Sequence, residues 1–336
     1  MPDGAAPVLE VKGLKTVFQT RGGAIHAVNS VSFHLQPGEL LGVVGESGSG
    51  KSVTMMSLLG LLPAPPADVC GGEVLLAGRD LLKISPEDLQ SVRGGKVGFI
   101  FQDPITSLNP VFTVGNQICE PLIKHLGMTK AAAETRAAEL LDTVGIPDAR
   151  KRLKDYPHQF SGGMRQRVMI AIALACNPDV LIADEPTTAL DVTIQAQILE
   201  LVRELRSKLG MAIVWITHDL GVIAGIADRV MVMYGGQIVE QAPVDDLFAN
   251  PLHPYTRALL RTIPALGAKR EARLEVIAGQ PPIMTEAPTA CAFRARCAHA
   301  FDRCHTENPL RRVVGPGRVG YGHDVACHWD PEAAHA

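Results

Sequence analysis

A glycine-rich loop that ends in a lysine and a hydroxyl residue is the stretch of the sequence best suited to chemistry. It stands between an apolar run at 40–44, which has the composition of a buried strand, and a segment at 53–59 that is typical of a helix. Glycines let backbone N–H groups converge on an anion, and a helix N-terminus adds partial positive charge. In such a P-loop the lysine reaches the β- and γ-phosphates and the hydroxyl ligates Mg²⁺. The sequence therefore predicts a nucleotide site made by Gly45, Ser47, Gly48, Ser49, Gly50, Lys51 and Ser52.

Two adjacent carboxylates end a second apolar run. The run at 180–183 is continuous, as in a parallel strand that is buried on both faces, and Asp184 and Glu185 follow it directly. Asp184 is placed to hold Mg²⁺ through water, and Glu185 is a candidate general base for the water that attacks a γ-phosphate. Two solvated charges at a strand end are the simpler alternative. We favour the metal site because a P-loop requires a second Mg²⁺ partner.

Two further polar residues follow apolar strands. Gln102 comes after the run at 97–101, and His218 comes after the run at 212–217. Because ligands bind at the carboxyl ends of parallel strands, the Gln102 amide could ligate Mg²⁺ or orient water, and His218 could reach a γ-phosphate. Each signal is weak alone, since a lone histidine is usually a core residue.

A serine with two glycines, Ser161-Gly162-Gly163, opens a helix and could form a second anion site. Taken alone, a capped helix start with flexible glycines is the simpler interpretation. Asp191 is predicted to cap an amphipathic helix that ends at Gly210. Phe18 ends the first strand of a predicted antiparallel ribbon, where it could stack on an adenine or belong to the core.

Composition limits the classes of function. The 336 residues carry a formal net charge of −3, so no global basic field favours nucleic acid as a partner. No apolar run reaches the length of a membrane span, and the N-terminus lacks the pattern of a signal peptide. We therefore expect a cytosolic protein that can dock on membrane components.

Four of the seven cysteines gather near the end of the sequence. In a reducing compartment such a cluster points to metal rather than to disulfides. Four thiolates suit either a [4Fe–4S] cluster or structural Zn²⁺, and gaps wider than those of zinc ribbons favour the iron–sulfur cluster. Nearby histidines keep zinc open, and unliganded core cysteines are the third interpretation. The predicted ligands are Cys291, Cys297, Cys304 and Cys327.

Together these motifs resemble those of ATP-binding cassette (ABC) ATPases, the cytosolic motors of ABC transporters. The glycine loop, Gln102, the turn at 161–163, the acidic pair, the Ala189-Leu190-Asp191 turn and His218 occur in the family's order over nearly the whole chain. The resemblance implies an α/β fold with a RecA-like P-loop core, an N-terminal antiparallel β subdomain and an inserted helical subdomain at about 104–176. A nucleotide-binding domain at 7–249 is then followed by a small Cys-rich C-terminal domain at 250–336.

The resemblance also assigns roles to several residues. Two cassettes of this family sandwich two ATP molecules, so that Ser161, Gly162, Gly163 and Asp191 contact the ATP held by the partner. Phe18 becomes the expected adenine platform. ATP and Mg²⁺ are the implied ligands, with Mg²⁺ held through Ser52, Gln102 and Asp184.

The C-terminal segments at 250–257 and 279–282, with the cysteine pattern, are similar to those of ATPases from dipeptide and oligopeptide importers. This similarity implies a second, non-identical ATPase, two integral-membrane permeases and an extracytoplasmic solute-binding protein as partners. The chain would then lie at the cytoplasmic face of the inner membrane. The alternatives are an importer ATPase for another solute such as nickel, a soluble ABC ATPase acting on nucleic acid or ribosomes, and an ATP-binding regulatory module.

Overall fold

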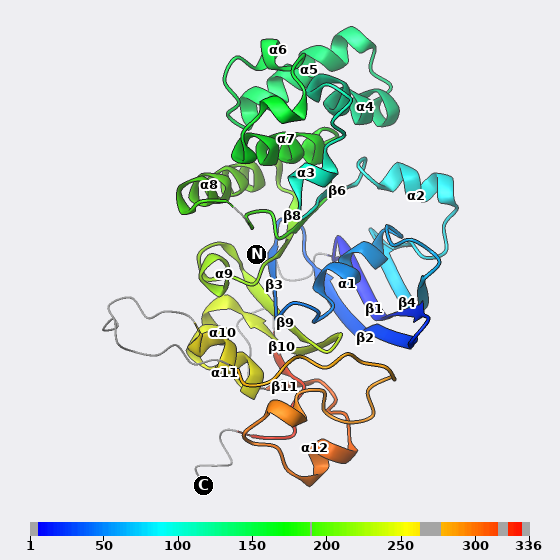
Figure 1. The fold of residues 1–336 in the computed structure, drawn as a ribbon, viewed down its shortest axis with the longest axis vertical. Helices are drawn as coiled ribbons and strands as arrows, with labels where there is room; N and C mark the ends of the chain where they lie inside the picture. The colour runs from blue at the N-terminus through cyan, green and yellow to red at the C-terminus, as the bar shows by residue number, and fades with distance from the viewer. Residues whose placement is uncertain (1–5, 189, 263–276, 315–321, 331–336) are drawn as a thin grey trace. The chain divides into compact units, whose positions relative to one another are not determined.

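The structure is a computed structural model, which describes residues 6–188, 190–262, 277–314 and 322–330. Its chain divides into two compact units. The first unit contains Met1–Leu35, Leu40–Leu82 and Thr217–Ala336, and the second contains Gln36–Glu39 and Lys83–Ile216 (Figure 1). Each unit therefore draws on segments that are distant in the sequence.

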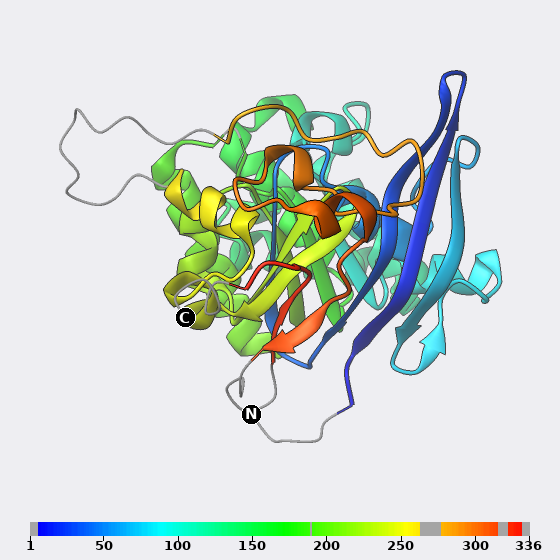
Figure 2. The same cartoon turned by 90° about the horizontal axis from the view of Figure 1, so that it is seen from below.

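An antiparallel sheet near the N-terminus belongs to the first unit. In the described part of the chain its strand order is β2-β1-β4-β5, and Figure 2 shows β1 and β2 as a long ribbon in blue. Burial alternates at the start of β1, where Leu9 and Val11 enter the core, and the alternation changes phase at the register shifts beyond Val11. The predicted N-terminal ribbon is confirmed. The strands are β1 (Leu9–Thr20), β2 (Gly23–Leu35), β4 (Ala67–Leu76) and β5 (Arg79–Asp80).

A second group of strands in the first unit leads into the glycine loop. Strand β3 (Leu40–Val44) is buried along its whole length and runs parallel to β9 (Arg229–Tyr234). Strand β10 (Gln237–Pro243) pairs with β9 across a turn in which Gly235 and Gly236 both have positive φ. Glycine adopts two such conformations in succession at little cost, as a tight hairpin turn requires.

The C-terminal residues add two short strands to this group. Strand β12 (His323–Val325) pairs with β10, and β11 (Arg312–Val314) pairs with β12. These pairings join the region beyond residue 250 to β10, so the predicted boundary at 249/250 stays a prediction. The helices of the first unit are α1 (Lys51–Leu58), α9 (Leu220–Ile226), α10 (Val244–Ala249), α11 (Pro254–Arg261), η2 (Arg294–Arg296) and α12 (Asp302–Thr306).

The second unit combines parallel strands with helices. Strand β7 (Val180–Asp184) lies between β6 (Val97–Ile100) and β8 (Ala212–Ile216), and β7 and β8 are buried throughout. Continuous apolar runs form such strands because both faces are covered. The helices are α2 (Pro86–Val92), α3 (Pro104–Ser107), α4 (Val114–Leu126), α5 (Lys130–Thr143), α6 (Ala149–Arg152), η1 (Pro157–Gln159), α7 (Gly162–Leu174) and α8 (Val192–Leu209).

Side-chain caps set the starts of three of these helices. The hydroxyls of Thr113, Thr129 and Ser161 accept hydrogen bonds from the first turns of α4, α5 and α7.

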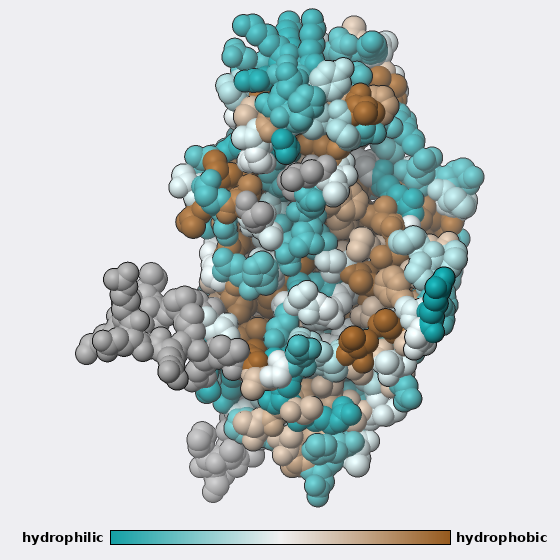
Figure 3. All heavy atoms as spheres, viewed as in Figure 1, coloured by the Kyte–Doolittle hydropathy of each residue, from teal (hydrophilic) through white to brown (hydrophobic). Residues whose placement is uncertain are grey.

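The outer surface of α5 and α6 is mostly hydrophilic at the top of Figure 3. Helices α4 to α7 fall within the predicted helical subdomain at about 104–176.

Candidate functional site

The glycine loop between β3 and α1 has a backbone that only glycine can adopt at two positions. Gly45 and Gly50 have φ values of 151° and 98°. A Cβ at Gly45 would lie 2.3 Å from the Met233 carbonyl oxygen, and one at Gly50 would lie 2.6 Å from that of Ala27. Both contacts are shorter than van der Waals distance. The chain itself therefore fixes the path of this loop.

Lysine and serine side chains line the same loop. Lys51 is only 5% exposed, and its Nζ donates to the carbonyl oxygens of Gly45, at 2.8 Å, and Glu46, at 3.1 Å. Ser49 Oγ is buried without a hydrogen-bond partner among the described residues. A buried hydroxyl of this kind is available to a ligand. Ser47 and Gly48 are exposed, and the half-buried Ser52 lies in the first turn of α1.

The acidic pair ends β7 in the second unit. Asp184 is 5% exposed and is the last residue of the strand. Glu185 has a φ of 46°, and its backbone N–H donates to the Ile216 carbonyl. Positive φ is costly for a glutamate and is typical of functional sites. The two carboxylates therefore differ in exposure, and Glu185 alone has a positive φ.

Gln102 lies beside this pair, as its position after β6 predicted. Its Nε2 donates to Glu185 Oε2 at 3.0 Å, and Thr188 Oγ1 donates to the same oxygen at 3.0 Å. The sequence analysis missed Thr188 as a partner of Glu185. The available signal was a hydroxyl residue three positions after the carboxylate. Two donors on one carboxylate oxygen hold the side chain of Glu185 in place.

Phe18 and His218 belong to the first unit. Phe18 lies in β1, in register with Ile25 on β2 and Ala67 on β4, and it is half-buried. His218 is exposed and follows Thr217, whose backbone N–H donates to the Val43 carbonyl on β3. The chain therefore places His218 close to the end of the strand that leads into the glycine loop.

The serine–glycine turn opens α7 in the second unit. Ser161 caps the helix by accepting from the Met164 N–H at 3.3 Å. Among the described atoms, none lies within 4 Å of a Cβ built on Gly162, whereas one on Gly163 would lie 2.8 Å from Ile194 Cγ2. Packing therefore explains the second glycine but not the first. The exposed backbone at Gly162 stays open to a ligand from outside the chain.

Asp191 is the N-cap of α8, as predicted. Its Oδ1 accepts from the Ile194 N–H at 2.9 Å. Ala189, which belongs to the same predicted turn, lies outside the described residues.

The four C-terminal thiols lie near one another. Burial, together with the nearby Cys291, Cys297 and Cys304, raises the pKa of Cys327 to about 12. The Cys291 N–H also donates to the Cys304 carbonyl at 3.1 Å. Four soft thiols suit iron or zinc chemically. In the described parts of the chain, however, no three His, Cys, Asp or Glu side chains are arranged as metal ligands.

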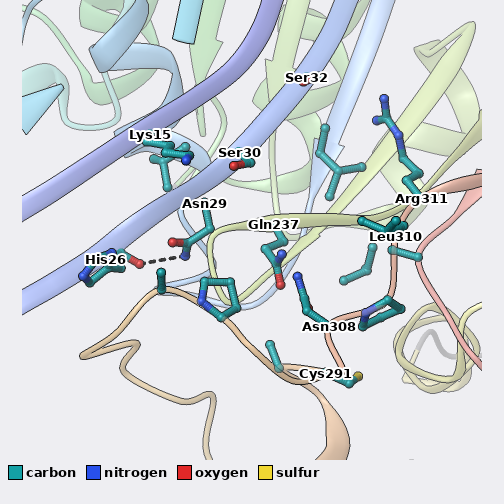
Figure 4. A pocket seen from close by; sticks show the side chains of 18 of the residues that line it. Lys15, His26, Asn29, Ser30, Ser32, Gln237, Cys291, Asn308, Leu310 and Arg311 are labelled. Carbon is teal, nitrogen blue, oxygen red and sulfur yellow. Dashed lines mark hydrogen bonds between the residues drawn. The ribbon is translucent and has the colours of Figure 1, made fainter. Parts of the chain in front are cut away.

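A cavity of about 720 Å³ in the first unit lies beside β1 and β2 (Figure 4). Lys15, His26 and Asn29 reach it from these strands, and Asn308 and Arg311 reach it from the C-terminal segment. Cys291 is the one predicted site residue among those that line it. The cavity is therefore distinct from the glycine loop.

Comparison with known proteins decides the family. The model described as "ABC transporter" matches residues 28–188, and the model described as "Oligopeptide/dipeptide transporter, C-terminal region" matches residues 239–304. The oligopeptide transport ATP-binding protein OppD of Bacillus subtilis is 55% identical over 294 residues, which cover 88% of this chain and 82% of OppD. The chain belongs to the ABC transporter ATPases.

One curated relative of this ABC ATPase extends over nearly its full length, and a solved relative covers most of it. The dipeptide transport ATP-binding protein DppD of Bacillus subtilis is 49% identical over 331 residues, covering 98% of this chain and 97% of DppD. A solved structure titled "Dimeric Structure of MJ0796, a Bacterial ABC Transporter Cassette" is 29% identical, with a TM-score of 0.63 over 70% of this chain and 98% of that chain. The RecA-like α/β cassette fold is thereby established.

The family fits the residues of both units. The ABC ATPase carries its glycine loop and its acidic pair within the matched range 28–188. ATP is accordingly its nucleotide, and the chain is an ATPase. In the described ranges, no helix is both long enough and apolar enough to cross a bilayer.

Proposed function

We propose that this ABC ATPase is the motor of an importer for dipeptides or oligopeptides, at the cytoplasmic face of the inner membrane. The observation that carries the proposal is the match of residues 239–304 to the C-terminal region of oligopeptide and dipeptide transporters. The names of OppD and DppD agree with it over most of both chains. Permeases and an extracytoplasmic solute-binding protein are the expected partners.

Within the proposed site, Lys51 and Ser52 bind the phosphates and Mg²⁺, and Gln102 and Asp184 complete the metal site. Bound Mg²⁺ neutralises charge on the phosphates. Glu185 accepts a proton from the attacking water, and His218 contacts the γ-phosphate. The hydrogen bonds from Gln102 and Thr188 support this role of Glu185, because they hold its carboxylate in place.

A second cassette completes the site in this proposal. Its Ser161-Gly162-Gly163 turn and Asp191 would contact the ATP held by the first cassette, and Phe18 would stack on the adenine. The exposure of Gly162 supports this arrangement, since a Cβ built there would meet no described atom within 4 Å apart from its chain neighbours and its own helix backbone. The solved relative with a TM-score of 0.63 is itself described as dimeric.

Exposed apolar residues of the second unit support a docking surface for a permease. Val111 and Phe112, which precede α4, are 71% and 51% exposed, and Ile123 and Leu126 on α4 are also exposed. Large apolar side chains that gather on a surface mark interaction sites. We assign this surface to an integral-membrane partner.

The decisive experiment is Glu185→Gln in a complex with the partner ATPase. ATP should still bind, hydrolysis should fall by about 100- to 1000-fold as expected for loss of a general base, and ATP should trap a closed dimer. Sizing of the complex with and without ATP, with a hydrolysis assay, measures all three. Glu204→Gln, which changes an exposed partner of Lys208, is the matched control. Normal turnover in Glu185→Gln, or no ATP-dependent association, would refute the mechanism.

The mutual proximity of Cys291, Cys297, Cys304 and Cys327 supports a second proposal, that they hold a [4Fe–4S] cluster, with Zn²⁺ as the alternative. Burial raises the pKa of the Cys291, Cys297 and Cys327 thiols. A metal would therefore have to displace their protons. Anaerobically purified protein should be brown and should lose that colour in Cys297→Ser but not in Cys70→Ser, which changes an exposed cysteine. Colourless protein with stoichiometric zinc would select the alternative.

A further inference from the structure

Glu46, the second residue of the glycine loop, forms an ion pair with Arg296, which lies far away in the sequence. Arg296 Nη1 donates to Glu46 Oε2 at 2.6 Å, and Arg296 Nη2 donates to Glu46 Oε1 at 3.0 Å. The arginine side chain is 5% exposed and that of Glu46 is 26% exposed. Two parallel hydrogen bonds between ions form the strong, geometrically specific type of ion pair. The pair joins residues that are 250 positions apart in the sequence.

The position of the Arg296 guanidinium is fixed by further contacts. Its Nε donates to the Ala278 carbonyl at 2.9 Å, Nη2 to the Ile277 carbonyl at 3.0 Å, and Nη1 to the Tyr234 hydroxyl at 3.2 Å. The guanidinium of an arginine stays protonated in proteins. Arg296 is therefore a permanent, immobile cation.

The backbone of Glu46 is held as well. Its N–H donates to the Tyr255 hydroxyl at 2.8 Å, and its carbonyl accepts from Lys51 Nζ at 3.1 Å. Tyr255 packs on Tyr234 and Phe293, with ring centroids 4.6 and 5.3 Å apart. Glu46 thus connects the lysine of the loop to an aromatic cluster and to Arg296.

A carboxylate inside a phosphate-binding loop poses an electrostatic problem. Its charge repels a triphosphate over several ångströms unless a cation compensates it. We propose that Arg296 is a positioning residue for the nucleotide site, which neutralises Glu46 and aims its carboxylate away from the phosphates. This role rests on the proposed nucleotide site. Because Arg296 directly precedes Cys297, the segment that carries the cysteines also sets the charge of the phosphate loop.

The test compares opposite charge changes in the full chain. For Arg296→Gln we expect the Kd for a fluorescent ATP analogue and the KM for ATP to rise about tenfold, with kcat within about twofold of the parent, since the unpaired Glu46 then repels the phosphates. Glu46→Gln should leave the KM unchanged or lower it. The double variant should return close to the parent value because the net charge is restored. The effect of Arg296→Gln should shrink in high salt.

Matched variants separate charge from contact. Arg296→Lys keeps the charge but loses the two-point grip, so its KM should lie between those of the parent and Arg296→Gln. Arg303→Gln removes an arginine that pairs with Glu307 on the surface, and it should change nothing. Thermal unfolding of each variant identifies any that fail to fold, and the double variant then carries the comparison.

Two outcomes would overturn the proposal. An unchanged KM in Arg296→Gln would show that the loop does not need the cation. If KM rises in both single variants and does not recover in the double variant, the pair supports the structure of the loop and does not act through charge. Failure of the nucleotide site itself gives a different result, namely normal ATP binding by Lys51→Ala.

Discussion

The two helix starts that carry serine and glycine, at α1 and α7, differ in how closely other parts of the chain pack around them. At the glycine loop, the Met233 and Ala27 carbonyls close on Gly45 and Gly50, and the lysine is buried. At the α7 turn, Ser161 is exposed and the backbone at Gly162 is uncovered by any described atom. Both termini offer N–H groups and partial positive charge. Only the first is assembled by its own unit.

Under the proposed function, this difference explains how one chain would contribute half of each of two ATP sites. A preformed loop binds its anion without help, because its conformational cost is met during folding. An open turn contacts its ligand only when another subunit brings that ligand to it. The comparison predicts that damage to the loop affects binding, whereas damage to the turn affects turnover only in the assembled pair.

The largest effect is expected for Lys51→Ala, which should weaken ATP binding by about 100-fold because a buried ammonium–phosphate contact is lost. Titration with a fluorescent ATP analogue measures the change. Lys96→Ala, which alters an exposed lysine paired with Asp179, is the control. Equal affinity in the two variants would show that the loop is not the primary anion site.

The turn at Ser161 should give a smaller and different effect. Ser161→Asp keeps a helix cap but places a carboxylate against the partner's phosphate, so hydrolysis by the assembled pair should fall on the order of 30-fold. ATP affinity of the isolated chain should be unchanged. Ser161→Asn, which caps without charge, should retain most of the activity. Weaker ATP binding by the isolated Ser161→Asp chain would contradict the assignment to the partner's site.

A pH-dependent loss of stability should follow from His253, which precedes the Tyr255 that holds the loop. Burial lowers the pKa of His253 to about 4. Between pH 6.5 and 4 the unfolded chain binds a proton that the native chain excludes, so stability should fall by about 1.4 kcal/mol per unit of pH as the pH decreases. Denaturant titrations at pH 7.0, 6.0 and 5.0 measure this slope.

His253→Asn should flatten that slope, since the titrating group is gone while a side-chain acceptor for the Tyr255 N–H remains. His158→Asn, which changes an exposed histidine, should leave the slope as it is. A slope that survives in His253→Asn would assign the proton uptake to another group.

The smallest effect is expected for the cap of α8. Asp191→Ala should cost about 1 kcal/mol of stability because the Ile194 N–H loses its partner. Asp191→Asn should restore the stability in thermal unfolding. If Asp191→Asn is stable but slow in the assembled pair, the carboxylate acts on the nucleotide; full activity would limit it to capping.

Local patterns predicted the strands and helix starts around the site. The apolar runs before Gln102, Asp184 and His218 correctly placed all three at the ends of strands, and the caps at Ser161 and Asp191 were predicted from residue type. Each of these features depends on neighbours in the sequence, where periodicity and capping rules apply.

Long-range contacts were beyond such rules. Nothing next to Arg296 indicates that it pairs with Glu46, because the partner is chosen by the packing of the C-terminal region. The same holds for the proximity of Cys327 to the other three thiols. The cysteine spacing predicted a donor set, which stays a prediction. It could not predict how the thiols are arranged, and the described residues hold no ligating arrangement.

The hydroxyl of Tyr255 bears on how this protein can be shortened. Tyr255 and Arg296, which both hold Glu46, lie beyond residue 249. A gene trimmed to encode only the first 249 residues would yield a cassette whose phosphate loop lacks both supports. The region beyond residue 249 therefore supports the phosphate loop, and the first expected effect of its removal is weaker nucleotide binding.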